Sequence, residues 1–154
     1  MQECEYRFAI EGINRTNLSQ PVLLVTSRKK QWAYPRSRRT RFVEEKLEMA
    51  RLFAAADVFL MPLVYDPFSN ICLEALSAGL PVITTRTNGF SEIIESGVEG
   101  EVLVEPSDAE AVARSIEAWS DPERRAAIKP RLEKRAAQFD PEANLKAVLA
   151  LLNH

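Results

Sequence analysis

The residues best placed to do chemistry lie where a short apolar run gives way to a helix, within residues 62–77. Asp66 stands in the loop, and the helix that follows carries three polar residues, Asn70, Glu74 and Ser77. Because these three are four and three residues apart, they share one face of the helix. The rest of the helix is apolar, which predicts burial, and a carboxylate on a mostly buried helix needs a polar partner. If Glu74 points toward the loop ends, a sugar hydroxyl could be that partner.

Several other kinds of site lack the residues that they need. The 154-residue chain has one histidine, His154, at its very end, so a Ser-His-Asp triad, a Cys-His pair or a histidine zinc site is not expected. Its two cysteines, Cys4 and Cys72, are far apart and form no C-x-x-C pair, and Cys72 is expected to be a packed core thiol. No stretch matches G-x-G-x-x-G or G-x-x-x-x-G-K, so classical dinucleotide and triphosphate sites are not supported. We expect no metal and no organic cofactor.

Charge and apolar runs set expectations for location and partners. The net charge of −2 gives the chain no overall attraction to nucleic acid, which is not an expected partner. The N-terminus carries Glu3 and Glu5 and no apolar run, so it does not read as a signal peptide. The longest apolar stretch, residues 58–64, is far shorter than the roughly 20 residues that span a bilayer. The expected location is the cytoplasm.

The elements that must position these residues alternate between strands and helices. Strands are predicted over residues 22–25, 40–43, 58–61, 82–85 and 101–104. Helices are predicted over residues 5–14, 45–56, 70–78 and 91–95 and, after the last strand, from a Ser107/Glu110 capping box to residue 119, from Pro122, and over residues 140–154. Such alternation predicts one α/β domain with a Rossmann-like parallel sheet of about five strands, helices on both faces and a helical C-terminus.

Ligands of such sheets bind beyond the carboxyl ends of the strands. That rule selects three loops, residues 26–39, 62–69 and 86–90. In the third loop, Asn88 and Gly89 are most simply a turn, and the alternative is that they face a ligand.

Seven basic residues and no acid occupy residues 28–41, which also contain Trp32 and Tyr34. The simplest interpretation is a solvated loop. Two functional alternatives remain open: a grip on a diphosphate that includes Arg28, or a patch for anionic membrane lipid, in which case the protein is peripheral at the inner face of the membrane.

Four motifs together resemble the donor domain of family 4 (group 1) retaining glycosyltransferases, which have the two-domain GT-B fold. They are a helix end and strand at residues 54–59 (AAADVF), two acidic residues eight apart at Asp66 and Glu74, a strand entry at residues 78–83 (AGLPVI), and a G-x-x-E turn at residues 89–92. The resemblance covers residues 21–139; residues 1–20 are atypical, because the family's domain opens with a strand and a helix that carry a basic pair.

The resemblance implies a role for each matching position. Glu74 would contact the ribose of a nucleotide and Asp66 the donor sugar, while backbone amides around Ser69 and Asn70 would face the diphosphate. A helix N-terminus suits that task, since its free N–H groups carry about half a positive charge. The co-substrate implied is a nucleoside-diphosphate sugar, with a UDP-sugar favoured, and the reaction is hexosyl transfer with retention, without the paired carboxylates of glycosidases.

Two departures from the family pattern bear on function. Asp66-Pro67 and Ser69 stand where the family usually has glutamate followed by glycines, and this variant is similar to lipopolysaccharide-core and related cell-envelope glucosyltransferases. No acceptor-binding domain is recognisable, so the chain is expected to be a single nucleotide-sugar-binding domain that transfers no sugar alone.

Alternatives remain for individual residues and for the chain as a whole. Asp66 could be only a helix cap, Glu74 a solvated helix residue, and Glu92 a partner of a helix dipole. The chain as a whole could be a donor domain of an enzyme, a non-catalytic nucleotide-binding remnant, or a module that pairs with a separate chain supplying the acceptor domain.

Overall fold

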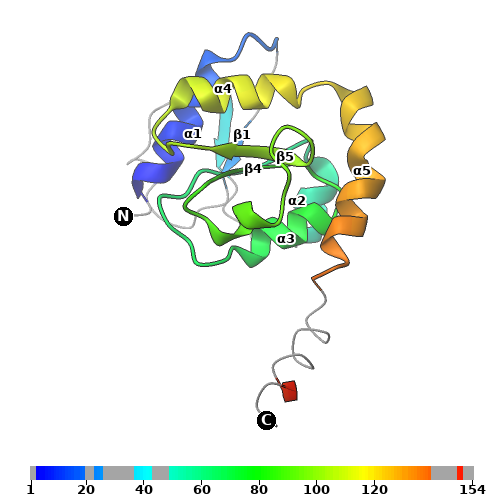
Figure 1. Cartoon of the computed structure of the whole chain (residues 1–154). Coiled ribbons are helices and arrows are strands. Elements are labelled where there is room, and N and C mark those ends of the chain that lie inside the picture. Colours follow the sequence, from blue (N-terminus) through cyan, green and yellow to red (C-terminus); the bar gives the residue numbers. More distant parts are fainter. Residues whose placement is uncertain (1–2, 20–22, 26–36, 43–48, 140–148, 151–154) are drawn as a thin grey trace.

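The computed structural model describes residues 3–19, 23–25, 37–42, 49–139 and 149–150 (Figure 1). Its elements, in chain order, are α1 (Glu3–Arg15), β1 (Leu23–Val25), β2 (Thr40–Phe42), α2 (Met49–Ala55), β3 (Phe59–Met61), α3 (Asn70–Ser77), β4 (Val82–Thr85), the 3-10 helix η2 (Gly89–Glu92), β5 (Gly100–Leu103), α4 (Ala109–Ala118) and α5 (Pro122–Ala136).

All strands of the described residues pair in parallel, as predicted. Strand β1 pairs with β2, and β4 pairs with β3 on one side and with β5 on the other. The five strands therefore form one group of two and one group of three. Strand β4 is buried along its whole length, as expected for the central strand of a parallel sheet. The carboxyl ends of β3, β4 and β5 lie at one edge, because these strands run the same way.

Helices cover both faces of the three-stranded sheet (Figure 1). Val82 belongs to a core shared with α2, α3 and α5, which includes the fully buried Leu76 and Leu132. Ile83, one residue further along β4, belongs to a second core shared with α4, which includes Trp119. Successive side chains of a strand point to opposite faces, so β4 contributes to both cores in turn. The predicted α/β fold with helices on both faces is confirmed.

Helix α1 packs against α4 (Figure 1). A Cβ placed on Gly12 would lie 2.4 Å from Cγ1 of Val112, so the glycine permits the close approach of the two helices. The Arg15 guanidinium contacts the Glu110 carboxylate at 2.6 Å. Arg39, just before β2, donates to the carbonyl oxygen of Ile13 at 3.1 Å. The helix predicted over residues 5–14 is confirmed and is slightly longer than expected.

Two predicted helix starts are wrong in detail. Helix α4 is capped by Asp108, whose carboxylate accepts from the Ala111 amide at 2.9 Å, and not by Ser107. Glu110 does not return to the cap, because its carboxylate contacts Arg15. The helix predicted over residues 91–95 is the 3-10 helix η2 at Gly89–Glu92, which starts earlier because Asn88, directly before it, is its N-cap and accepts from the Phe90 amide.

Some predictions fall outside the described residues. They concern the helix over 140–154 apart from residues 149–150, the basic segment 28–41 apart from residues 37–41, and the first part of the helix over 45–56. In the part of the chain that the structure describes, no helix combines the length and apolar character needed to cross a membrane.

Candidate functional site

Two of the three loops selected from the sequence meet at the carboxyl edge of the sheet. The loop after β3 (residues 62–69) and the loop after β4 (residues 86–88) form a parallel bridge between Asp66 and Asn88. The Asp66 amide donates to the Thr87 carbonyl at 3.3 Å, and the Gly89 amide donates to the Asp66 carbonyl at 2.9 Å. The backbone of Asp66 is therefore held through both its amide and its carbonyl by Thr87 and Gly89, which follow β4.

Threonine hydroxyls add to this junction. The Leu63 carbonyl accepts from Oγ1 of Thr85 at 2.6 Å and from Oγ1 of Thr87 at 3.3 Å. Thr84 Oγ1 donates to the Met61 carbonyl at 3.1 Å, where β3 ends. These threonines were not among the predicted site residues, although three hydroxyls within four residues at a strand end are a recognisable signal in the sequence.

The Asp66 side chain shapes its own loop. Its Oδ1 accepts from the Phe68 amide at 3.0 Å, which is an Asx turn. The N-cap of α3 is Ser69, so the alternative that Asp66 caps this helix is not what the structure shows. The carboxylate is half-buried, and Oδ1 alone is used in the described hydrogen bonds. Oδ2 is left to accept from a ligand.

The N-terminus of α3 is open to a ligand. The Ser69 side chain makes no capping hydrogen bond, and it is buried beside Cys72. The amides of Cys72 and Leu73 donate to the Ser69 carbonyl, at 3.0 and 3.4 Å. Among the described residues, the amides of Asn70 and Ile71 have no such acceptor, as expected for the orphan donors of a helix start. Any contact from Ser69 to a ligand would therefore come from its backbone.

Glu74 lies on the exposed face of α3, together with Asn70 and Ser77. The three polar residues share one face, as predicted, but the expectation that Glu74 needs a partner because of burial is wrong. The buried side chains of α3 are Cys72, Ala75 and Leu76. No hydrogen bond or ion pair of the described residues involves the Glu74 carboxylate, which is available to a ligand.

Asn88 faces the interior. Its side chain is fully buried, with Oδ1 accepting from the Phe90 amide at 3.0 Å and Nδ2 donating to Oγ1 of Thr84 at 3.0 Å. Cys72 Sγ lies 3.8 Å from the same Nδ2, and burial raises the pKa of the Cys72 thiol to about 11. The side-chain amide of Asn88 thus stabilises the loop of the site from the protein interior. Cys72 is the packed core thiol that the sequence predicts. A ligand contact by Asn88 or Gly89 would have to come from the backbone.

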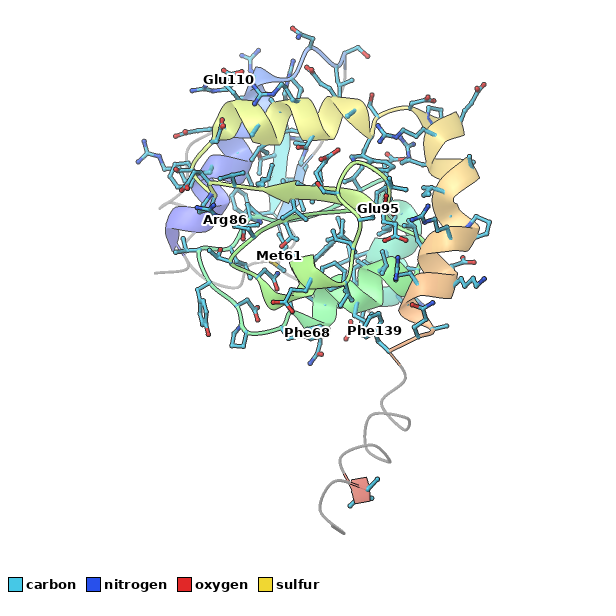
Figure 2. The ribbon with its side chains drawn as sticks, in the orientation of Figure 1. Met61, Phe68, Arg86, Glu95, Glu110 and Phe139 are labelled. Atoms are coloured by element: carbon cyan, nitrogen blue, oxygen red, sulfur yellow. The ribbon has the colours of Figure 1, made fainter. Side chains whose placement is uncertain are left out.

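Only some of the basic residues near the site belong to the described part of the chain. Arg28 lies outside the described residues. Arg86 (labelled in Figure 2), which was not among the predicted site residues, is exposed directly after β4 and contacts the Glu105 carboxylate at 3.2 Å. Among the described residues, no group of three or more histidine, cysteine or carboxylate side chains could hold a metal ion.

Comparison with known proteins identifies the family. Residues 5–121 match the family described as glycosyl transferases group 1. The chain belongs to the group 1 glycosyltransferases. The match starts before residue 21, where the resemblance predicted from the sequence begins, and so includes most of α1.

The relatives of this glycosyltransferase chain include a glycosyltransferase of lipopolysaccharide core biosynthesis. It is 36% identical over 118 residues to the lipopolysaccharide core biosynthesis glycosyltransferase LpsE of Rhizobium meliloti; the alignment covers 75% of this chain and 34% of LpsE. The chain therefore spans about a third of the length of that relative. The resemblance predicted from the sequence is confirmed, including its lipopolysaccharide-core type.

Solved structures agree on the fold. Sucrose-phosphate synthase from Thermosynechococcus elongatus matches with a TM-score of 0.79 at 23% identity, over 99% of this chain and 42% of that enzyme. Anabaena HepE in complex with UDP matches with a TM-score of 0.61 at 26% identity, over 75% of this chain and 32% of HepE.

Proposed function

We propose that this chain binds a nucleoside-diphosphate sugar at the carboxyl edge of β3 and β4, as the donor half of a retaining hexosyltransferase. One observation carries the proposal: the uncapped N-terminus of α3 lies beside the loop junction that holds Asp66, and the Glu74 carboxylate on the same helix pairs with none of the described residues. A helix N-terminus attracts phosphate through its free N–H groups and its dipole.

In this proposal each part of the ligand has its own contact. The amides of Asn70 and Ile71 receive the diphosphate, the Glu74 carboxylate accepts from the ribose hydroxyls, and the free oxygen of Asp66 accepts from the sugar. The two backbone amides would stabilise the charge that develops on the departing diphosphate. Arg28 is proposed as an additional grip on the phosphates. The sugar nucleotide is a co-substrate, and the proposal requires no metal or organic cofactor.

UDP is the proposed nucleotide, because HepE, which shares the fold and 26% of the matched residues, was solved with UDP bound. The proposed acceptor is a cell-envelope glycan, by likeness to LpsE. We place the reaction in the cytoplasm, with residues 28–41 as a contact to the inner face of the membrane. Transfer also needs a platform that orients the acceptor, since orientation is worth about 7–11 kcal/mol of a bimolecular barrier.

A nucleotide-binding remnant, or a module paired with another chain, would bind the same ligand. Neither would transfer sugar without a further partner. Mass spectrometry of products, after incubation of the chain with sugar nucleotides and glycan acceptors, would detect transfer. Sustained product formation by the 154-residue chain alone is not expected, and it would rule out both alternatives.

Replacing Glu74 with glutamine should weaken UDP binding by about tenfold, because a hydrogen bond to an ionised acceptor is worth about 1.5–3 kcal/mol and glutamine keeps part of it. The side chain is exposed, so the free energy of unfolding should change by less than about 0.5 kcal/mol. Calorimetric titration with UDP measures the first effect and urea unfolding the second. Glu133→Gln, on the exposed side of α5, is the matched control and should leave UDP affinity unchanged. Equal UDP affinities for all three proteins would remove Glu74 from the site.

Replacing Asp66 with asparagine tests the sugar contact. Asparagine can still accept from the Phe68 amide, so the Asx turn should persist and UDP should bind as before. Affinity for a UDP-sugar should fall about tenfold, since the charged acceptor is lost. If UDP-sugar affinity stays the same, Asp66 only shapes the loop.

A further inference from the structure

Exposed apolar side chains gather beyond the carboxyl ends of the strands. Among the described residues, five large hydrophobic side chains are exposed, and four of them are in this region: Val64, Tyr65 and Phe68 after β3, and Val104 after β5. Tyr65 is the most exposed of the five, at 73%. Exposed apolar groups clustered beside polar ones are typical of ligand-binding or interaction surfaces. The region coincides with the edge where the proposed nucleotide site lies.

The backbone that carries Tyr65 is fixed on both sides. Two residues before it, the Leu63 carbonyl accepts from the hydroxyls of Thr85 and Thr87. One residue after it, Asp66 exchanges backbone hydrogen bonds with the second loop, at 3.3 and 2.9 Å. The exposure of the ring is therefore a property of an anchored loop, and binding a ligand would cost little ordering of the backbone.

The neighbouring aromatic side chain behaves differently. The Phe68 ring (labelled in Figure 2) packs edge-on against the buried Phe90, with centroids 6.3 Å apart, and this contact anchors the loop to the core. None of the ring contacts or hydrogen bonds recorded for the described residues involves Tyr65. Phe68 therefore stabilises the fold, whereas the Tyr65 side chain is exposed to solvent.

The order of groups along the chain matches the order of groups along a sugar nucleotide. Glu74 lies one helical turn beyond Asn70, about 6 Å along the axis of α3. Tyr65 precedes the N-terminus of α3 in the chain and is next to Asp66. With the diphosphate on the first amides of α3 and the ribose at Glu74, the remaining end of the ligand points toward residues 64–66. We propose that the Tyr65 ring packs against the hexose of the bound sugar nucleotide and is a specificity-determining residue for the donor sugar. This inference rests on the proposed function.

Tyr65 and Asp66 together suit the chemistry of a hexose. A pyranose ring exposes C–H groups on its faces and hydroxyls around its rim, so it needs one apolar wall and a few polar acceptors. Tyr65 offers a flat apolar surface with a polar tip, and Asp66 offers a carboxylate oxygen. Sites with mostly apolar walls and a small number of placed polar groups are the common pattern for small ligands.

Calorimetric titration of the 154-residue chain with UDP and with UDP-glucose, UDP-galactose and UDP-N-acetylglucosamine tests the inference. The sugar nucleotide that binds the wild-type chain most tightly is then used for the variants. Tyr65→Ala should weaken binding of that sugar nucleotide about three- to tenfold and leave UDP affinity unchanged, because the lost contact involves the sugar alone. Tyr65→Phe, which keeps the ring, should bind both ligands as the wild type does. Val104→Ala removes another exposed apolar group, 61% exposed, just after β5 and is the control; it should alter neither affinity.

The outcomes separate this inference from the function on which it rests. If Tyr65→Ala weakens UDP and the sugar nucleotide equally, the ring contacts the nucleotide and the sugar assignment is wrong. If it changes neither, or if UDP-sugars bind no differently from UDP, the inference is also overturned, while UDP binding still supports the proposed function. If the wild-type chain binds no UDP at all, the proposed function fails and the inference fails with it.

Discussion

Replacing Gly89 with alanine is expected to separate the two loops of the site and to abolish UDP binding. A Cβ at this position would lie 2.0 Å from the carbonyl oxygen of Pro67 and 3.0 Å from its carbonyl carbon. Both atoms are backbone, so no side chain can swing aside to make room. The Gly89 amide would move away from the Asp66 carbonyl that it now contacts at 2.9 Å. We expect a loss of about 3 kcal/mol in the free energy of unfolding, from overpacking and lost hydrogen bonds.

Gly97→Ala is the matched control. It adds the same methyl group where no atom lies within 4 Å, although the φ of +83° should cost about 1–2 kcal/mol. Urea unfolding and UDP titration of both variants make the comparison. The control should bind UDP as the wild type does. UDP binding by a folded Gly89→Ala chain would show that the loop junction does not shape the site.

Most of the strands were predictable because they are short apolar or β-branched runs that can be recognised on their own. The run at Val82–Thr85 has a proline before it, which marks its start. All five predicted strands appear within a residue or two of their expected positions. Helix α1 was found from three apolar residues at approximately helical spacing. In both cases the signal is local, and burial in the fold agrees with it.

The site was less predictable, because it depends on which way side chains face. The composition of α3 suggested burial all round, but a helix on the outside of a sheet keeps one stripe in solvent, and Asn70 and Glu74 occupy it. Asn88 read as a simple turn residue, yet its amide is buried, because Thr84 and the Phe90 amide supply partners. Such partners come from the folded loops and leave no periodic pattern in the sequence.

An ion cluster that the sequence analysis missed holds α5 to the loop before β5. Glu99 is 1% exposed, and its Oε1 accepts from Nε of Arg131 at 2.9 Å and from Nε of Arg135 at 3.2 Å. Arg131 also contacts Glu95 at 2.6 Å, and Glu95 lies beside α5 (Figure 2). The partners are 32 and 36 residues from Glu99, which is beyond the reach of any local pattern.

Glu99→Ala should lower the free energy of unfolding by about 3 kcal/mol. This is the low end for breaking a buried ion pair, because both guanidinium groups reach solvent and are not left as buried charges. Urea unfolding at pH 7 measures the loss. Glu133→Gln, which removes an exposed carboxylate of α5 with a 4.0 Å contact to Lys129, should cost less than about 1 kcal/mol.

The same cluster should make stability depend on pH in a defined direction. Burial by itself would raise the pKa of Glu99, but hydrogen bonds from the Glu95 amide, Arg131 and Arg135 outweigh it and hold the pKa below the ordinary value of 4.5. A carboxyl group whose folded-state pKa is lowered stabilises the fold above its ordinary pKa, and the contribution is lost as the pH falls through the folded-state value. The difference in unfolding free energy between the wild type and Glu99→Gln should therefore be constant from pH 7 to about 5 and shrink below about 4.5. A difference that stays constant down to pH 3 would mean that the Glu99 carboxylate is not what holds α5 in place.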